Sequence, residues 1–203
     1  MNVLCRRLIL ACCTTLFTGV LMADDMAATH YPSAIFSGGC FWCLEADFEK
    51  LEGVVAVESG YTGGAEPNPS YEQVSQGKTG HAEAVRVYYD RQRVSYEKLL
   101  DYFWRHIDPT MKNKQFCDTG TQYRSAIFYQ NAAERQLAQS SKLMLERSGR
   151  FPHIYTEIVA ADTFYPAEDY HQDYYKKNPI RYQFYRSSCG SDERIKLLWN
   201  EAQ

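Results

Sequence analysis

The sequence predicts an α+β fold, a single two-layer domain in which helices flank a mixed β-sheet built around a β-α-β core. Three observations support this prediction. Short apolar or alternating runs typical of strands recur along the chain, and segments with apolar residues at helical spacing lie between them. The 203 residues contain no proline- or glycine-rich linker. Their content of 45% hydrophobic and 23% charged residues is ordinary for a globular protein.

Residues 1–23 have the layout of a secretory signal peptide. Two arginines precede an apolar stretch, and Ala23 is followed by two aspartates. The apolar stretch is short for a permanent anchor, so we expect cleavage after Ala23, export to the periplasm and no membrane association afterwards. Residues 24–33 would then form an N-terminal extension and residues 34–203 the folded domain. A lipoprotein cleavage site before Cys12 is an alternative, but it leaves almost no apolar segment ahead of the cysteine.

Signal cleavage would leave four cysteines in the mature chain, Cys40, Cys43, Cys117 and Cys189. A domain of this size does not need a disulfide framework to be stable. Because these four cysteines are unevenly spaced, we expect redox chemistry rather than structural cross-linking. Two structural disulfides remain the alternative.

The first element after the extension is predicted to be a strand, a glycine turn and a helix. The apolar run 34–36 ends in two glycines, and beyond them apolar residues recur three and four positions apart. Cys40 is therefore expected at the helix N-terminus, where free N–H groups and the macrodipole would lower the pKa of its thiol. Two alternatives are a small buried cysteine and half of a zinc site formed with Cys43.

The remaining elements follow from the same patterns. Further strands are predicted at 54–57, 83–89, 125–129 and 154–161. Further helices are predicted from Ser95 to Ile107, from Asn131 to Gly149, and at 168–177 and 195–199. Turns or irregular segments are predicted at 60–69, 110–121 and 178–190.

Several polar residues lie where such elements begin or end. Glu83 stands at the mouth of a strand, where partial desolvation would raise its pKa and make it a proton donor, although a solvated strand end is the alternative. Asp118 and Tyr123 lie in a polar loop, and they either face a site or only shape that loop. Tyr71 is equally ambiguous. His171 has no second close ligand, so we expect a hydrogen-bonded structural residue rather than a metal ligand.

Taken together, six segments resemble the A-type peptide-methionine sulfoxide reductases. They occur in the order and at the separations of that family, and the resemblance extends from about Ala34 to Trp199. The segments are Gly39-Cys40-Phe41-Trp42-Cys43, Ser59-Gly60-Tyr61-Thr62-Gly63-Gly64, Asn68-Pro69-Ser70-Tyr71, Gly80-His81-Ala82-Glu83-Ala84-Val85, Gly120-Thr121-Gln122-Tyr123-Arg124-Ser125 and Tyr165-Pro166-Ala167-Glu168-Asp169-Tyr170-His171-Gln172.

The resemblance implies a reaction and a role for each residue in it. Cys40 would attack the sulfur of methionine sulfoxide, and Glu83 would protonate the oxygen that leaves. Tyr71 and Tyr123 would donate hydrogen bonds beside Glu83, and Asp118 would orient this polar cluster.

The same resemblance implies how the substrate is held. Phe41 and Trp42 would form an apolar wall for the methyl group on sulfur. A pocket that distinguishes methyl from oxygen is chiral, and the family acts on the S epimer of the sulfoxide. The expected substrates are oxidised proteins and free methionine sulfoxide.

The resemblance also implies a thiol cycle without cofactor or metal. Cys40 would become a sulfenic acid and condense with a second thiol. Either Cys43, three residues away, or Cys189, in a glycine-flanked and mobile C-terminal stretch, would resolve it. Thioredoxin or a thioredoxin-like protein would then reduce the disulfide. Cys117 has no assigned role.

Other partners and functions are less favoured by the sequence. A net charge of −3 without a basic cluster argues against nucleic acid as a partner, and we expect a monomer. A thiol-disulfide oxidoreductase would use Cys40 and Cys43 and would not need Glu83. A non-enzymatic secreted module would hold Cys40 oxidised. A zinc module is disfavoured because Cys117 and Cys189 supply no second Cys-x-x-Cys pair.

Overall fold

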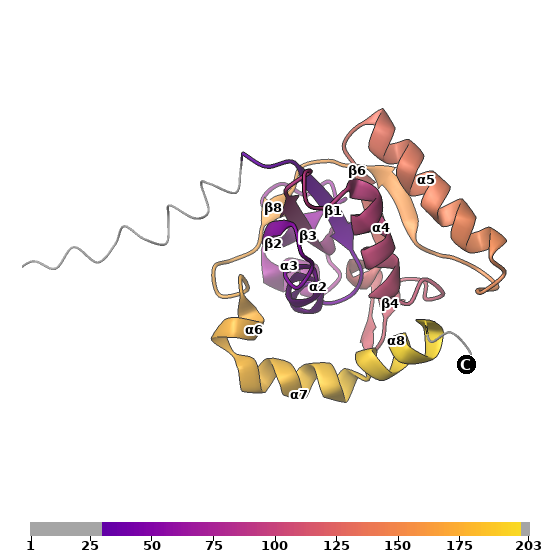
Figure 1. Cartoon of the computed structure of the whole chain (residues 1–203). Coiled ribbons are helices and arrows are strands. Elements are labelled where there is room, and N and C mark those ends of the chain that lie inside the picture. The colour runs from indigo at the N-terminus through magenta and orange to yellow at the C-terminus, as the bar shows by residue number, and fades with distance from the viewer. Residues whose placement is uncertain (1–29, 200–203) are drawn as a thin grey trace, which may run out of the picture.

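Six strands form a mixed sheet at the centre of the structure, a computed structural model that describes residues 30–199 (Figure 1). The strand order is β7-β6-β1-β3-β2-β8, and neighbouring strands are antiparallel except β6 and β7, which are parallel. This confirms the predicted mixed sheet. The strands are β1 (Ser33–Ser37), β2 (Val54–Thr62), β3 (Ala82–Tyr89), β6 (Ala126–Tyr129), β7 (Glu157–Ala160) and β8 (Tyr165–Pro166).

Helices cover the sheet and continue past its end. In Figure 1, α5 lies outside α4, while α6, α7 and α8 form one continuous segment that crosses the end of the domain next to α2. The helices are α2 (Phe41–Phe48), α3 (Tyr71–Ser75), α4 (Tyr96–Arg105), α5 (Ala132–Arg147), α6 (Tyr174–Lys177), α7 (Pro179–Cys189) and α8 (Ser191–Trp199). A hairpin of β4 (Lys114–Gln115) and β5 (Asp118–Thr119) leads into a 3-10 turn at Thr121–Tyr123.

Successive residues of β1 supply the two faces of the sheet, as the pleat requires. Phe36 points toward the helices, where its ring stacks on Phe48 of α2 at 5.1 Å and on Phe103 of α4 at 5.0 Å between centroids. Ile35 points the other way into a smaller cluster with Phe128, against which Phe164 packs. The main core therefore lies under α2 and α4, and it fixes the helix that carries Cys40.

The predicted helix starts are confirmed by their capping contacts. Ser95 accepts the N–H of Lys98 at 3.2 Å, and Asn131 accepts the N–H of Glu134 at 2.9 Å. The carboxylate of Glu134 accepts the N–H of Gln130, one residue further back than in a standard capping box.

Several elements differ from their predicted bounds. β2 continues through Thr62, paired with β3 along its length, and Phe164 packs where a Gly60 side chain would stand. The strand predicted at 154–161 spans only Glu157–Ala160, and the helix predicted at 168–177 is helical only from Tyr174. The short strands β4 and β5 formed where irregular chain was expected, and the helix α3 formed where no element was predicted.

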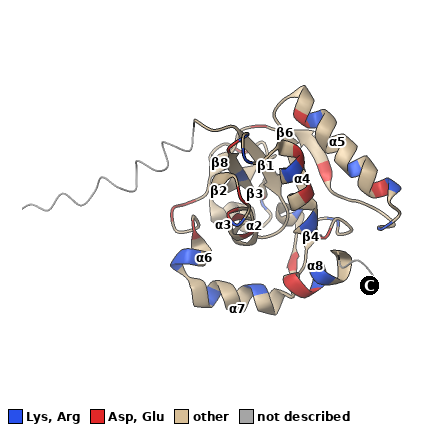
Figure 2. Cartoon of the chain, in the orientation of Figure 1, with Lys and Arg blue, Asp and Glu red and all other residues tan. Residues whose placement is uncertain are grey.

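The largest difference is α7, in the segment 178–190 that was expected to be irregular. Pro179, which follows the helix predicted at 168–177, stands at the first turn of α7, where a proline needs no N–H partner. The helix ends at Gly190, which adopts a φ of +68°. Basic residues lie on α6 and near the end of α7, and acidic residues lie in the first turn of α8, which suits the helix dipoles (Figure 2).

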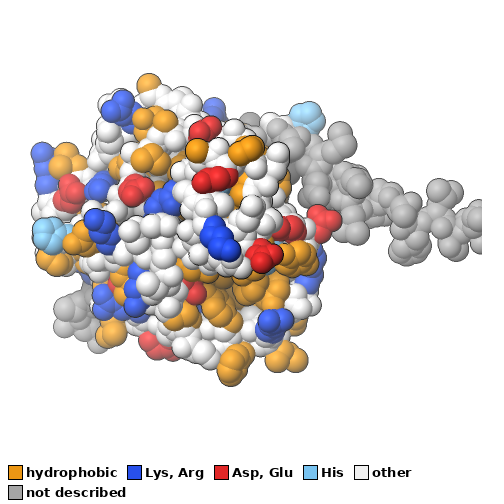
Figure 3. Space-filling view, turned by 180° about the vertical axis from the view of Figure 1, so that it is seen from behind, with side chains coloured by type: hydrophobic (Ala, Val, Ile, Leu, Met, Phe, Trp, Pro, Cys, Tyr) orange, Lys and Arg blue, Asp and Glu red, His pale blue; other side chains and the backbone are white. Residues whose placement is uncertain are grey.

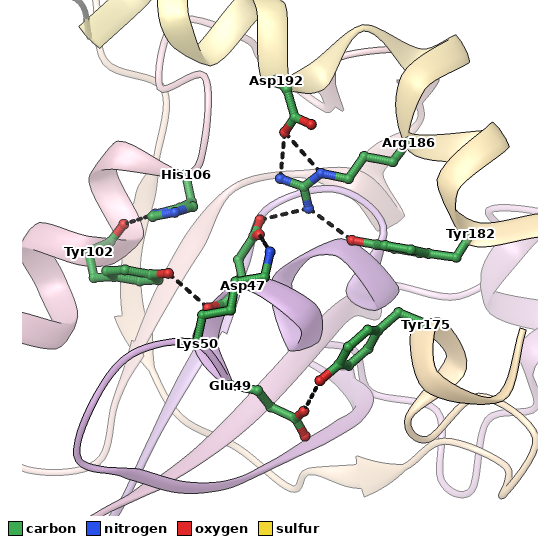
Figure 4. Close-up of polar contacts among 9 residues, drawn as sticks. All are labelled: Asp47, Glu49, Lys50, Tyr102, His106, Tyr175, Tyr182, Arg186 and Asp192. Carbon is green, nitrogen blue, oxygen red and sulfur yellow. Dashed lines mark hydrogen bonds and ion pairs between the residues drawn. The ribbon is translucent and has the colours of Figure 1, made fainter. Parts of the chain in front are cut away.

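Arg186 attaches this C-terminal segment to the rest of the domain (Figure 4). Its buried guanidinium donates to Asp47 of α2 at 3.0 Å, to Asp192 of α8 at 2.6 and 2.9 Å, and to the Tyr182 hydroxyl at 2.9 Å. A buried charge with this many partners is compensated, so α7 is held against the helix of Cys40.

The expectations about the N-terminus concern mostly residues outside the described part of the chain. The predicted signal peptide 1–23 and most of the extension 24–33 lie there, so they stay predictions. Within residues 30–199, no helix has the length and apolar character needed to cross a bilayer.

Candidate active site

Cys40 is the N-cap residue of α2, as predicted. It follows Gly39, whose φ of +89° suits glycine alone and whose missing side chain leaves room for Gln115, 2.8 Å from the position of a Cβ. The turn thus places the cysteine at the end of the core strand β1 and at the beginning of α2. Its side chain is 9% exposed.

The thiol of Cys40 is not acidified by this position, and the predicted lowering of its pKa is wrong. Burial raises its pKa well above the usual value, and the Cys43 thiol and the carboxyls of Glu83 and Asp118 raise it further. Desolvation therefore outweighs the helix N-terminus. In this buried position Cys40 is a neutral thiol, so its proton must leave as its sulfur attacks.

Glu83 is the carboxyl beside this thiol. It lies in β3 opposite Tyr61 of β2, it is 2% exposed, and its Oε2 accepts the backbone N–H of Phe41 at 3.1 Å. Burial raises the pKa of Glu83 to about 8, and the charge of Asp118 also raises it, against the opposing hydrogen bond from Phe41. The carboxyl is thus protonated at neutral pH beside the residue that follows Cys40, as a proton donor requires.

Tyr71 and Tyr123 approach the same carboxyl from α3 and from the 3-10 turn. Burial and the negative charges of Glu83, Asp118 and Cys40 raise the pKa of both hydroxyls, which remain O–H donors. The structure therefore brings these predicted residues to one place, although the sequence left their orientation open.

Glu168 fixes the position of Tyr71. Its two carboxylate oxygens accept the Tyr71 backbone N–H at 2.9 Å and the Tyr61 hydroxyl at 2.7 Å. Sequence reasoning did not assign Glu168 a role, although it lies in one of the six resembling segments.

Asp118 is held by a residue that the sequence analysis missed. The Tyr185 hydroxyl of α7 donates to its Oδ2 at 2.5 Å, and burial raises the pKa of Asp118 despite this contact. Burial and the negative charges of Cys40 and Asp118 also raise the pKa of Tyr185, which places α7 beside the site. The signal available in the sequence was Pro179 at the start of this helix and Gly190 after its end.

Phe41 and Trp42 form an aromatic group next to Cys40. The Phe41 ring stacks on Tyr71 at 6.3 Å, and the Trp42 ring stacks on Tyr174 of α6 at 3.7 Å. The Trp42 indole donates to Nδ1 of His171 at 3.0 Å. Burial lowers the pKa of His171 to about 4, so the ring is a neutral structural acceptor, as predicted.

The four cysteines form two different pairs. Cys40 and Cys43 are free thiols, whereas Cys117 and Cys189 form a disulfide across 72 residues. Cys189 was expected in a mobile stretch able to reach Cys40, but it is the last residue of α7 and is already bonded. Of the two cysteines expected to resolve Cys40, Cys43 is therefore a free thiol and Cys189 is bonded to Cys117.

This disulfide also bears on the zinc alternative. Among the described residues, ligand atoms of Cys117, Asp118 and Cys189 lie within 4.8 Å of one another. A zinc site needs thiolates, and here the two sulfurs are bonded to each other. The donor set does not fit a metal in this state.

The arrangement suits an attack by sulfur on a polar S–O bond. A cysteine thiol, a neutral carboxyl and two tyrosine hydroxyls lie close enough to raise one another's pKa, and an aromatic group lies next to the cysteine. Such donors stabilise an oxygen that gains negative charge, and the aromatic rings accept a sulfur-bound methyl group.

Comparisons with known proteins point the same way. Residues 32–203 match the family described as peptide methionine sulfoxide reductase. The chain is 50% identical over 167 residues to the peptide methionine sulfoxide reductase MsrA of Bacillus licheniformis, which covers 82% of this chain and 92% of that relative. It is 51% identical over 172 residues to the MsrA/MsrB protein of Vibrio cholerae, covering 84% of this chain, but it spans only 46% of that relative.

Solved structures share the fold. The crystal structure of Mxr1 from Saccharomyces cerevisiae in reduced form is similar with a TM-score of 0.69 and 35% identity, over 73% of this chain and 86% of that chain. Mxr1 in complex with Trx2 is similar with a TM-score of 0.50 and 23% identity, over 70% and 84% of the two chains, which shows the fold alone.

Proposed function

Because the chain belongs to the peptide methionine sulfoxide reductase family and is an oxidoreductase that reduces methionine sulfoxide, we propose that it acts on the S epimer, in proteins and as the free amino acid. One observation carries the assignment of its catalytic groups. The Glu83 carboxyl, protonated at neutral pH, is hydrogen-bonded to the backbone N–H that directly follows Cys40.

The proposed chemical step transfers one oxygen from the sulfoxide to Cys40 and leaves Glu83 protonated at its end. The Cys40 sulfur attacks the sulfoxide sulfur while Glu83 gives its proton to the oxygen, and the thiol proton of Cys40 returns to Glu83. Tyr71 and Tyr123 stabilise the oxygen through hydrogen bonds, and Asp118 orients the cluster. The attack forms a bond between the Cys40 sulfur and the substrate sulfur. The sulfur–oxygen bond of the sulfoxide then breaks as the protonated oxygen bonds to the Cys40 sulfur, and the new sulfur–sulfur bond breaks. Methionine leaves, and Cys40 holds the oxygen as a sulfenic acid.

Epimer selection would come from the two sides of the site. With the oxygen directed at Glu83 and the methyl group against Phe41 and Trp42, only one arrangement about sulfur leaves the side chain pointing outward. The family resemblance identifies that arrangement as the S epimer, with the R epimer left to a different reductase. The function that follows is repair of oxidised proteins.

The cycle would close through a disulfide. Cys43 or Cys189 condenses with the Cys40 sulfenic acid, and a thioredoxin-like protein reduces the product. The reductant class is supported by the solved complex of Mxr1 with Trx2, and Mxr1 in its reduced form shares 35% identity with this chain.

We further propose that residues 1–23 direct export to the periplasm and that the mature protein is a monomer bound neither to membrane nor to nucleic acid. The face in Figure 3 supports the absence of nucleic-acid binding, because positive and negative side chains are interspersed on it rather than gathered into a basic patch. N-terminal sequencing of the protein from fractionated cells tests the export, and size-exclusion chromatography with light scattering tests the monomer.

The central experiment supplies separated S and R epimers of a methionine sulfoxide peptide with dithiothreitol as reductant. We expect consumption of the S epimer alone, and none of either epimer with Cys40→Ser. Consumption of the R epimer would contradict the proposed specificity. Reduction of a test disulfide without consumption of either epimer would instead favour a thiol-disulfide oxidoreductase.

A further inference from the structure

We propose that Cys117 is the last cysteine of an internal relay, so that the external reductant opens the Cys117–Cys189 disulfide rather than a disulfide at Cys40. This inference rests on the proposed function and adds a residue to its recycling path. We call Cys40 and Cys43 the inner pair, and Cys117 and Cys189 the outer pair.

Access separates the two pairs. Cys40 is 9% exposed and Cys43 is partly buried, whereas Cys117 lies exposed on the β4–β5 hairpin. A protein dithiol must bring its own sulfur into line with the bond it opens, so it reaches an exposed sulfur far more readily than a buried one. The outer pair is therefore the one that a protein reductant can attack.

The surroundings of the outer disulfide also favour Cys189 over Cys117 as the sulfur that leaves as a thiolate. The backbone N–H of Cys117 donates to the Cys189 sulfur at 3.2 Å. Attack on the exposed Cys117 sulfur would expel Cys189 as a thiolate, and this N–H would stabilise the developing charge. Asp118 lies 3.7 Å from the Cys117 sulfur, which disfavours negative charge on Cys117 itself.

A small cavity lies between Cys43 and residues that flank the outer pair. It measures about 10 Å³, and its lining includes Cys43 of the inner pair. The same lining includes Phe116, the residue before Cys117, and Ser191, the second residue after Cys189. Side chains on both sides of the outer disulfide thus face the same space as Cys43. That space has room for at most about one water molecule, so a sulfur can enter it only if the lining shifts.

The position of Cys189 permits such a shift. It is the last residue of α7, and Gly190 joins that helix to α8 with a left-handed φ of +68° and no atom within 4 Å of where a Cβ would stand. Arg186, one turn earlier, holds the body of α7 against Asp47. Once the outer disulfide is reduced, the end of the helix can move while its remainder stays in place.

The relay balances in atoms and electrons. The Cys43 thiolate attacks the Cys40 sulfenic acid, which forms the inner disulfide and releases the oxygen as water. The Cys189 thiolate attacks Cys43 and expels Cys40, and the Cys117 thiolate then attacks Cys189 and expels Cys43. Each exchange breaks one S–S bond and forms one. The two electrons return when a dithiol protein reduces the outer disulfide.

Disulfide mapping of the wild-type protein tests this path without any substitution. The fully reduced protein receives one equivalent of the S sulfoxide and no reductant, and free thiols are then alkylated and the peptides analysed by mass spectrometry. We expect a Cys117–Cys189 cross-link with Cys40 and Cys43 alkylated. A persistent cross-link at Cys40 with Cys117 alkylated would overturn the relay, although methionine would still have formed as the proposed function requires.

The number of methionines formed without reductant gives a second test. With excess sulfoxide, the reduced wild type should form two methionines per chain, because the relay frees Cys40 once, and Ser188→Ala should match it as a neighbouring exposed control. The double variant Cys117→Ser with Cys189→Ser should form one. A purely structural outer disulfide predicts one for every protein, and failure to form any methionine would contradict the proposed function instead.

Discussion

The inner and outer cysteine pairs lie on one domain but in contrasting surroundings. The inner pair is three residues apart at the start of α2, it is unbonded, and the carboxyls of Glu83 and Asp118 lie near enough to raise the pKa of Cys40. The outer pair is 72 residues apart, it is bonded, and it joins an exposed hairpin to the end of α7. The surroundings of the inner pair are set by the sheet core, whereas those of the outer pair are set by the docking of the C-terminal helices.

This difference separates two chemical demands. Oxygen transfer needs a desolvated site in which a carboxyl stays protonated, and burial provides that at Glu83. Recycling needs a sulfur that another protein can reach, and exposure provides that at Cys117. A single cysteine pair cannot be both buried and exposed. In the proposed relay the inner pair therefore serves oxygen transfer and the outer pair serves recycling.

The largest expected effect is that of Glu83→Gln, which should impair oxygen transfer and leave recycling unchanged. Glu83→Gln should slow sulfoxide reduction by about 100-fold to 10,000-fold, because the proton donor is lost while the hydrogen bond to Phe41 can persist. Steady-state kinetics on the S epimer measure this loss. Reduction of the outer disulfide by a thioredoxin-like protein should proceed at the wild-type rate, and a comparable loss there would break the separation of the two pairs.

The pH profile sharpens the same prediction. Wild-type activity should fall as pH rises through about 8, where Glu83 loses its proton. A raised carboxyl pKa in the folded state also means that stability falls as pH rises from about 4.5 to about 8. Glu45 on α2 is a matched control, since burial raises its pKa to about 8 too, but it accepts the Asp173 N–H. Glu45→Gln should flatten the stability profile and keep the activity profile.

The next effect concerns the attachment between the regions. Arg186→Met leaves the buried Asp47 without its partner in α7, and it should lower the free energy of unfolding by about 3 to 5 kcal/mol. Urea denaturation measures the change. Arg93→Met is the control, because its exposed ion pair with Glu52 should contribute less than about 1 kcal/mol. Equal losses for the two variants would show that α7 is not held by Arg186.

The smallest effect concerns the single hydrogen bond that joins α7 to the acidic cluster. Tyr185→Phe removes the donor to Asp118 and should reduce kcat/KM by about 3-fold to 10-fold. Tyr175→Phe removes the same atom from a tyrosine that donates to Glu49 away from the site, and it should match the wild type. A loss with both variants would indicate a general effect of docking the C-terminal helices.

Local patterns predicted most of the fold and the centre of the site. Ser95 and Asn131 start helices because their side chains cap them, and the glycines before Cys40 set up its turn, all within a few residues of sequence. The raised pKa of Glu83 also followed from its place at the mouth of a buried strand. These features depend on neighbours in sequence.

Features that depend on distant neighbours were missed. The pKa of Cys40 was predicted to fall because only its own helix was considered, whereas burial by remote elements raises it. Helix α7 was missed because its stability comes from Arg186 and its remote partners rather than from an apolar stripe. The Cys117–Cys189 bond required that docking to be known first.

The hydrogen bond from the Phe41 N–H to Glu83 has a consequence for mutational tolerance. Because the donor belongs to the peptide bond, any residue except proline at position 41 can supply it. Side chains along the wall of the site can therefore diverge to fit other substrates while the acid keeps its place beside the nucleophile. The position of the acid relative to the nucleophile thus depends on the backbone at residue 41, and substitutions of its side chain leave this hydrogen bond in place.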